Sequence, residues 1–386
     1  MRLAAALITV VALAAGAASK GGATASHRAA TPASRNATFP SWSPDGKQIL
    51  FGYGGRIVRV SSRSGGPLRT AHAGSFDPLF WAPGGQIVFR GSGDSINWYS
   101  VLVQGGKAKP IPFPSCGTAP GLQCWPDSCL ACSPDTFAIL TPHRDYAAVT
   151  TDFGAGNPPP PESIALLKLK PGHAPVEIST PLNAEERSGA VSDSILSFSP
   201  HGRQLIFRRD GGTGPTGLMA FRLGGGAPVP LAQSGLRGAT LLPSDAQRVQ
   251  WSPDGRWVAF VENESLEVVP TTGTNAPRVL PPCPDFGDFL SGFAWSPTSA
   301  LIAYDCLSNL ALDRGNLLTV RPDGTHLTDL LSDRPLRYVN RLFGLPEPAQ
   351  WSPDGSRLVF VAHRVGQQAT HVWTVRPNGH DLIRRG

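Results

Sequence analysis

Short apolar runs recur along the chain, and no polar residues alternate with the apolar ones inside them. Examples are Ile49-Leu50-Phe51, Ile87-Val88-Phe89, Leu205-Ile206-Phe207, Val258-Ala259-Phe260 and Leu358-Val359-Phe360. An antiparallel strand with one face in water alternates, whereas a strand that is buried on both faces reads as a continuous apolar run. The pattern therefore predicts short strands in sheets that are each packed between two neighbouring sheets.

One phrase recurs just before such strands. After Trp42-Ser43-Pro44-Asp45-Gly46, full copies begin at Trp251 and Trp351, weaker copies at Trp81, Phe198 and Trp295, and a degraded copy at Leu140. The copies lie roughly 40 to 60 residues apart, and a propeller blade usually takes about 40 to 50 residues. We therefore predict an all-β chain folded as a seven-bladed β-propeller of four-stranded antiparallel blades, with six blades as the alternative.

The phrase is typical of a turn between the first two strands of a blade. Proline fixes φ near −65°, aspartate accepts hydrogen bonds from nearby N–H groups, and glycine allows positive φ. We accordingly interpret Asp45, Asp254 and Asp354 as turn residues, and the repeated tryptophans as packing residues between blades. The fourth strand of each repeat is short and often contains proline, which suits the outer edge of a sheet.

The repeat resembles that of a known protein family. The stretch from Trp251 to Phe260, Trp-Ser-Pro-Asp-Gly-Arg-Trp-Val-Ala-Phe, is similar to the repeat of the TolB-like and WD40-like propellers. The resemblance covers residues 37–386 and implies the fold. The same family supplies the propellers of prolyl-oligopeptidase-like enzymes, whose hydrolase domains carry a Gly-x-Ser-x-Gly elbow. This chain has no such motif, so the resemblance implies architecture and no catalytic residue.

The N-terminal residues are typical of an export signal. Arg2 precedes an apolar stretch from Leu3 to Ala15, and Ala15-Gly16-Ala17 resembles a cleavage site. We predict a signal peptide over residues 1–18, a flexible leader over 19–36 and the propeller over 37–386. The mature chain is then secreted or lies in the bacterial periplasm or cell envelope, without a membrane span. An uncleaved anchor is the alternative.

The charge is modest and dispersed. The formal net charge is +6 and the sequence pI about 9.2. Basic residues form no run longer than pairs such as Arg208-Arg209, so the sequence shows no phosphate-tracking stripe and argues against a nucleic-acid partner. The positive net charge leaves open a weak attraction of the protein to anionic surfaces.

Six cysteines in an exported chain favour disulfides. Cys283 and Cys306 flank the first two strands of the sixth repeat, and we predict that they pair. The others crowd between the second and third repeats, where we predict two more disulfides with the pairing open: Cys116, Cys124, Cys129 and Cys132. A metal site or a redox-active pair is the alternative for this cluster, although its spacing does not match a repeated Cys-x-x-Cys zinc site.

The loops of the repeat are unequal, and the long ones should carry recognition. Turns between the first and second strands and between the third and fourth are short, and the remaining connections, which emerge at the opposite face, are long. The candidates for binding at that face and at the channel mouth are Arg208, Arg209, Glu262, Asp305, His363, Trp98 and Trp125.

No nucleophile elbow, metal quartet or cofactor motif occurs in the sequence, so we expect no cofactor and assign no catalytic or metal-binding residue. The sequence favours an exported, monomeric, non-enzymatic binding module that recognises a protein, a peptide or an envelope component. The alternative is a secreted hydrolase or lyase with its site at the mouth of the central channel.

Overall fold

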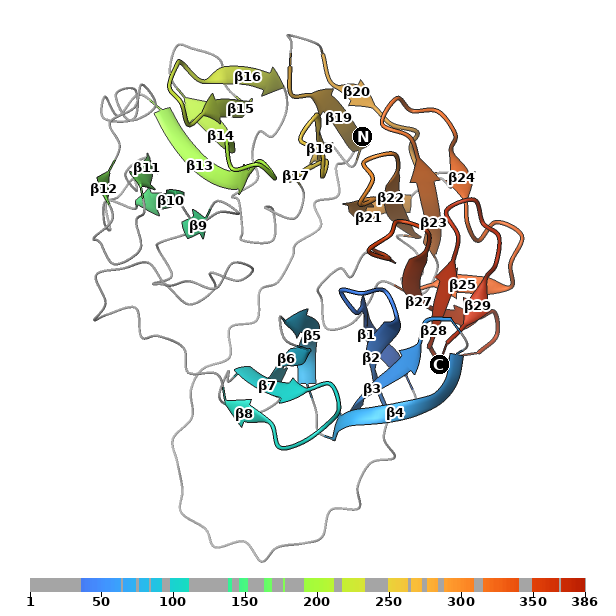
Figure 1. The fold of residues 1–386 in the computed structure, drawn as a ribbon. Helices are drawn as coiled ribbons and strands as arrows, with labels where there is room; N and C mark the ends of the chain where they lie inside the picture. The colour runs from blue at the N-terminus through green and yellow to red at the C-terminus, as the bar shows by residue number, and fades with distance from the viewer. Residues whose placement is uncertain are drawn as a thin grey trace, which may run out of the picture. The chain divides into compact units, whose positions relative to one another are not determined.

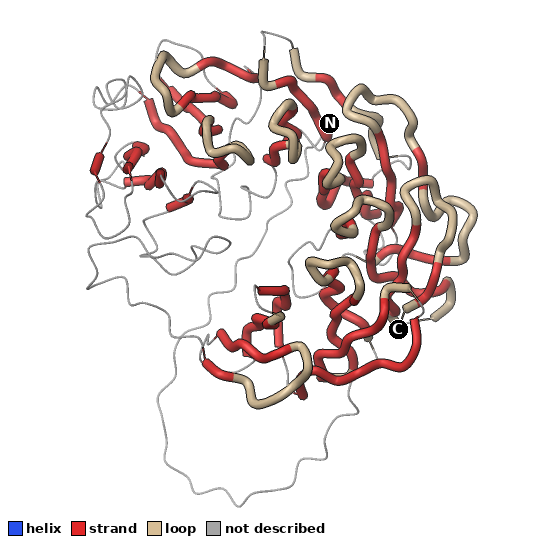
Figure 2. The backbone as a smooth tube through the Cα atoms, viewed as in Figure 1, coloured by secondary structure: helices blue, strands red, loops and turns tan. Residues whose placement is uncertain are grey.

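The computed structural model describes most of the chain from residue 36 onward. The described ranges are 36–63, 65–73, 76–82, 85–91, 98–110, 138–140, 146–151, 163–168, 176–177, 191–211, 217–232, 249–262, 265–272, 276–283, 288–308, 315–339, 349–367 and 369–385. Within these ranges the structure contains strands and no helix (Figure 2). The predicted all-β class is confirmed.

The strands form seven antiparallel sheets in the described residues, which we number 1 to 7 in chain order (Figure 1). Sheets 1 to 3 contain β1 (Ala37–Trp42), β2 (Gln48–Tyr53), β3 (Arg56–Ser61), β4 (Gly65–Ala73); β5 (Phe76–Ala82), β6 (Gln86–Gly91), β7 (Trp98–Leu102), β8 (Lys109–Pro110); and β9 (Ala138–Leu140), β10 (Tyr146–Thr151), β11 (Ser163–Lys168), β12 (Val176–Glu177).

Sheets 4 to 7 complete the set. They contain β13 (Val191–Phe198), β14 (Gln204–Gly211), β15 (Gly217–Arg222), β16 (Val229–Ala232); β17 (Val249–Trp251), β18 (Trp257–Glu262), β19 (Ser265–Pro270), β20 (Arg278–Val279); β21 (Asp288–Trp295), β22 (Ile302–Ser308), β23 (Gly315–Val320), β24 (Thr328–Asp329); and β25 (Leu336–Tyr338), β26 (Gln350–Trp351), β27 (Leu358–Arg364), β28 (His371–Val375), β29 (Ile383–Arg384). The blade count of seven stays a prediction for the whole chain.

Each sheet is built from consecutive strands, so that order along the chain equals order across the sheet. Sheet 7 departs from this plan, because β25 and β26 both pair with β27 and so divide its first strand into two pieces. In sheet 1 the first strand is continuous but carries a bulge at which Phe39 adopts a φ of 50°. The long connection between the fourth strand of sheet 6 and Trp351 is one that the repeat pattern predicts to be a loop; it contains the short strand β25, which corrects that expectation.

The second strand of each well-packed sheet is buried on both faces, as the apolar runs predicted. In β14, Ile206 packs with Phe260 of sheet 5, whereas Phe207 packs with Ile164 of sheet 3. Side chains alternate across a strand, so one run of apolar residues serves two interfaces. Each large side chain buried this way contributes about 1.5–3 kcal/mol.

The Ser-Pro-Asp-Gly turns are held by a repeated hydrogen-bond set. Ser252 Oγ donates to Asp254 Oδ1 at 2.6 Å, Arg256 N donates to the same oxygen at 3.1 Å, and Trp257 N donates to Ser252 Oγ at 2.9 Å. The turns after Trp42 and Trp351 repeat the same pattern. The aspartates are therefore turn residues, in agreement with the sequence interpretation.

Removal of one turn carboxylate should cost stability in a pH-dependent way. Burial alone would raise the pKa of Asp254, but the hydrogen bonds from Ser252 Oγ and Arg256 N outweigh it and hold that pKa below its usual value. A lowered pKa means that the carboxylate stabilises the fold at neutral pH and that this contribution is lost as the pH falls through the folded-state pKa.

We therefore expect Asp254→Ala to lower the free energy of unfolding at pH 7 by about 0.5–1.5 kcal/mol. The difference from the unaltered chain should shrink below about pH 4, as urea titrations at several pH values would show. Asp254→Asn retains one acceptor oxygen, so its free energy of unfolding should lie between those of Asp254→Ala and the unaltered chain. A loss that is constant from pH 7 to pH 3 would contradict the assignment.

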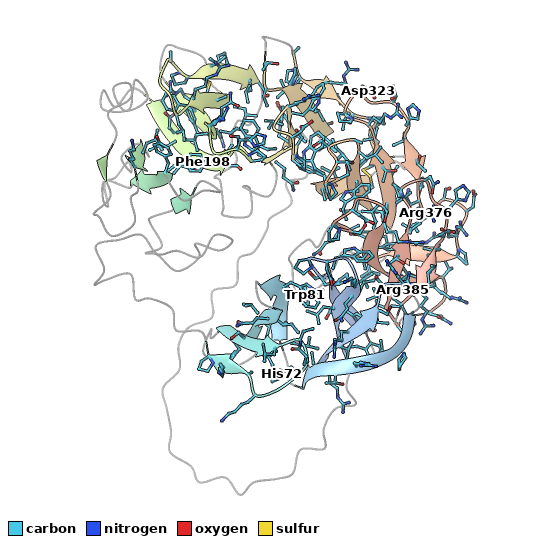
Figure 3. All side chains as sticks on the ribbon, viewed as in Figure 1. His72, Trp81, Phe198, Asp323, Arg376 and Arg385 are labelled. Carbon is cyan, nitrogen blue, oxygen red and sulfur yellow. A yellow bond between two sulfur atoms is a disulfide. The ribbon has the colours of Figure 1, made fainter. Side chains whose placement is uncertain are left out.

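The repeated tryptophans join neighbouring sheets. The indole Nε1 of Trp81 donates to Ser41 O of sheet 1, Trp295 Nε1 donates to Gln250 O of sheet 5, and Trp351 Nε1 donates to Ala294 O of sheet 6. Each acceptor immediately precedes the anchor aromatic of the previous sheet. Trp81 and its phenylalanine counterpart Phe198, which has no N–H to donate, are labelled in Figure 3.

The same contact joins the last sheet to the first. Trp42 Nε1 donates to Gln350 O at 3.3 Å, and Ala37 N donates to Thr370 O at 3.2 Å. From the C-terminus, the buried Arg385 donates from Nε to Thr374 Oγ1 and from Nη1 to Arg63 O. Sheet 7 takes its outer strand β29 from its own repeat, so the described residues close this seam by side-chain and backbone contacts without exchanging a strand.

Candidate functional site

Four of the predicted candidates lie at equivalent ends of second strands. Arg208 and Arg209 lie near the end of β14, Glu262 is the last residue of β18, and Asp305 lies in β22. All four are nearly or fully buried, with exposed fractions between 0 and 5%. A fifth candidate, His363 in β27, is half-buried, and its Nδ1 is hydrogen-bonded to Gln367 O.

Arg209 belongs to a buried ion pair. Its Nε and Nη2 donate to the two carboxylate oxygens of Asp193 in β13, at 2.8 and 2.6 Å, and its guanidinium lies 5.3 Å from the ring centroid of Phe207. Asp193 is completely buried. A binding residue at the loop-bearing face should be removable at little cost in stability, but loss of Arg209 would leave a buried carboxylate without its cation, so Arg209 has a structural role.

Glu262 and Arg208 face the interface between sheets 4 and 5. Glu262 follows Phe260 by two positions, and Arg208 follows Ile206 by two positions, while Phe260 and Ile206 belong to one core cluster between these sheets. Residues two apart project from the same face of a strand. The two charged side chains therefore continue this apolar interface toward the end of the strands where the long loops emerge.

The carboxyl group of Glu262 is poorly compensated. Its Oε2 is buried and has no hydrogen-bond partner among the described residues, and burial raises its pKa above the usual value. Glu267 in β19 lies across from Phe260 in register, on the same face of sheet 5. Its pKa is also raised, first by burial and then by repulsion from Glu262.

This arrangement can perform acid–base chemistry. A carboxyl group that is desolvated holds its proton to higher pH, and two neighbouring carboxyl groups resist ionising together. A carboxyl group that keeps its proton to higher pH than usual can act as a general acid, and a neighbouring carboxylate can act as a general base. A carboxyl group whose pKa is raised by burial and by a neighbouring charge is a candidate member of a functional site.

The disulfide lies at the same end of sheet 6. Cys283 is bonded to Cys306 of β22, with Cα atoms 5.6 Å apart and a sequence separation of 23. The predicted pair is therefore present. Tyr304 Oη donates to Pro281 O at 2.9 Å, so the segment before β21 is attached twice to β22, next to Asp305.

The remaining candidates lie outside what the structure describes. Trp125 and the cluster of four cysteines fall outside the described residues, as do residues 1–35 with the predicted signal and leader: Cys116, Cys124, Cys129 and Cys132. Trp98 is the first residue of β7, and its side chain is not described. The described ranges hold no group of three or more potential metal ligands and no helix that could span a membrane.

Two members of the site were missed by the sequence interpretation. Asp193 had no detectable signal, because the strand pairing that brings it to Arg209 is not visible in its neighbours. Glu267 had one: it is an acidic residue between Leu266 and Val268 in an otherwise apolar strand, and an ionisable residue in such a strand is unusual.

Comparison with known proteins identifies the fold. No family model and no curated protein sequence matches the chain. A solved structure of puromycin hydrolase is similar with a TM-score of 0.50 and 18% identity, over 92% of this chain and 54% of that one. A prolyl endopeptidase gives 0.48 and 10%, over 91% and 50%. Oligogalacturonate lyase from Vibrio parahaemolyticus gives 0.47 and 9%, over 89% and 90%.

The likeness to puromycin hydrolase, with the antiparallel four-stranded sheets, confirms the β-propeller class. The chain spans about half the length of the puromycin hydrolase that it resembles. The comparison contradicts the expectation of a non-enzymatic binding module, since the puromycin hydrolase with the same fold is named as an enzyme. The alternative, a secreted hydrolase or lyase, is taken up below as a proposal.

Proposed function

We propose that the protein is an exported propeller enzyme, a hydrolase or a lyase, that uses Glu262 as its acid–base group. The observation that carries the proposal is the buried Glu262 Oε2, which has no hydrogen-bond partner among the described residues. An uncompensated buried carboxyl group costs folding free energy. Chains keep such costs at sites where a reaction uses the group.

The neighbours of Glu262 suit the role. Glu267 lies on the same face, and repulsion between the two carboxyl groups separates their protonation steps. In the proposal Glu262, the more buried of the two, acts as the proton donor, and Glu267 accepts a proton. Arg208, at the same interface between sheets 4 and 5, would stabilise negative charge that develops on the substrate.

The substrate class follows from the expected location. Export through residues 1–18 would place the enzyme among peptides and cell-envelope polymers, and we propose one of these as its substrate, with the enzyme acting as a monomer. The Cys283–Cys306 disulfide supports an oxidising compartment. The Trp-Ser-Pro-Asp-Gly repeats support membership of the TolB-like and WD40-like propellers, with seven blades.

Activity and pH dependence test this function together. The full chain would be assayed with a panel of peptide amides, peptide esters and oligosaccharides, at pH values from 4 to 9. We expect one class to be turned over, and Glu262→Gln to lower kcat by about 10²–10⁴-fold, the usual contribution of a general acid or base.

Two further variants make the result specific. Glu267→Gln should also lower kcat and should remove the acidic limb of the pH–rate profile, because it removes the group that has to be deprotonated to accept a proton. Asp333→Asn, at an exposed position after sheet 6, should change neither kcat nor the profile. A folded protein that turns over no member of the panel, or a Glu262→Gln variant with unaltered kcat, contradicts the proposal.

A further inference from the structure

Basic residues recur at the turns that connect the first strand to the second and the third to the fourth. We call the surface formed by these turns the short-turn face. Its cations in the described residues are Lys47, Arg203, Arg256 and Arg357 after the first set of turns, and Arg63, Lys107, Arg222, Arg321 and Arg376 at the second set. All are exposed except Arg357, which is half-buried. Arg376 is labelled in Figure 3.

Contacts between sheets show that these turns form one continuous face. A Cβ on Gly255 would lie 3.6 Å from His201 of the turn in sheet 4, and one on Gly355 would lie 3.6 Å from Pro297 of the turn in sheet 6. Across the seam, a Cβ on Gly46 would lie 3.7 Å from Pro353. The turns of consecutive sheets therefore touch one another.

The second set of turns adjoins the same face. Three hydrogen bonds between neighbouring sheets lie there. Asp254 N donates to Ser299 Oγ of sheet 6 at 3.0 Å, Arg278 Nη1 donates to Asp323 O at 2.8 Å, and Thr319 Oγ1 donates to Pro377 O at 2.8 Å. Each bond joins one sheet to a turn of the next. Residues dispersed along the sequence are thus gathered from sheets 4 to 7 and sheet 1.

The acidic residues of this face are engaged by their own turns. Asp45, Asp254 and Asp354 accept hydrogen bonds from the serine two positions earlier, and Asp323 accepts bonds from Thr325 N and Oγ1. Asp381 pairs with Arg376 at 2.7 Å. Lys47 and Arg256 lie 3.6 and 3.9 Å from the aspartates of their own turns, and Arg357 lies 3.4 Å from Asp381. Five aspartates thus oppose nine cations, and a paired side chain such as that of Arg256 is still 82% exposed.

We propose that the short-turn face docks the protein on an anionic lipid surface. The cations are spread over six sheets rather than aligned in a stripe, so a flat surface can meet many of them at once, whereas a linear polymer would meet few. Cations near an anionic bilayer are attracted within about one Debye length. The opposite ends of the strands, where Glu262 lies, then stay open to substrate.

Vesicle binding tests the proposal without any substrate. The full chain would be mixed with vesicles of phosphatidylcholine alone or with about one-third phosphatidylglycerol, at low and at high salt, and the bound fraction measured by sedimentation. We expect binding to the anionic vesicles only, and its loss in about 1 M salt, where the Debye length falls to about 3 Å.

A charge-matched pair of variants locates the surface. Arg222→Gln/Arg256→Gln/Arg321→Gln removes three cations from the short-turn face, and we expect its partition coefficient to fall about tenfold to a hundredfold. Arg56→Gln/Arg69→Gln/Arg364→Gln removes three exposed cations from elsewhere and should bind as the unaltered chain does. Equal losses in both variants, equal binding to neutral vesicles, or no binding at low salt would overturn the proposal. Activity plays no part in this readout, so its failure is distinct from failure of the proposed enzyme function.

Discussion

Replacement of Arg209 by methionine should lower the free energy of unfolding by about 3–5 kcal/mol, as expected when one member of a buried ion pair is removed. The variant retains most of the side-chain volume but leaves Asp193, which is fully buried, without the two hydrogen bonds from Nε and Nη2. Urea unfolding followed by tryptophan fluorescence at pH 7 would measure the loss.

A double replacement separates the charge from the packing. Arg209→Met with Asp193→Leu removes both charges, and we expect it to recover most of the stability that the single variant loses, since a buried pair contributes little net free energy relative to apolar residues. If the single variant is as stable as the unaltered chain at pH 7, the ion pair has no structural role.

The second large effect should come from the Cys283–Cys306 disulfide. Replacement of both cysteines by alanine opens a loop with a sequence separation of 23, and the chain-entropy relation gives a loss of about 3 kcal/mol. Unfolding would be compared without reductant. Because the other four cysteines are retained, adding reductant to the double variant reports their contribution separately.

Sequence and structure agree where the signal is local. The turn at Asp254 is encoded by five consecutive residues, and the hydrogen bonds of Ser252 Oγ that hold it join atoms no more than five positions apart. The apolar run ending at Phe260 likewise predicts burial on both faces, because alternation is a property of the strand itself. For these reasons the all-β class, the turns and the packing role of the tryptophans could be predicted.

The candidate site depends on contacts that the sequence does not encode locally. The sequence alone indicates that Arg209 is an exposed binding residue. The structure shows instead that it is paired with Asp193, 16 positions earlier. Glu262 was named as a candidate, but its relation to Glu267 depends on a hairpin register, and its relation to Arg208 on the packing of two sheets. The cations of the short-turn face could not be grouped from the sequence for the same reason: they are dispersed along the chain, and only the packing of the repeats brings them to one surface.

The contact between sheets 7 and 1 has a consequence for how the number of repeats in such a chain can change during evolution. Because every sheet in the described residues uses strands from one repeat only, no strand is shared across a boundary. Insertion or deletion of one whole repeat would leave each remaining strand pairing intact and alter only the angle between neighbours. The contact of Trp42 with Gln350 is of the same type as that of Trp351 with Ala294, so a duplicated repeat would arrive with the means to join both of its neighbours.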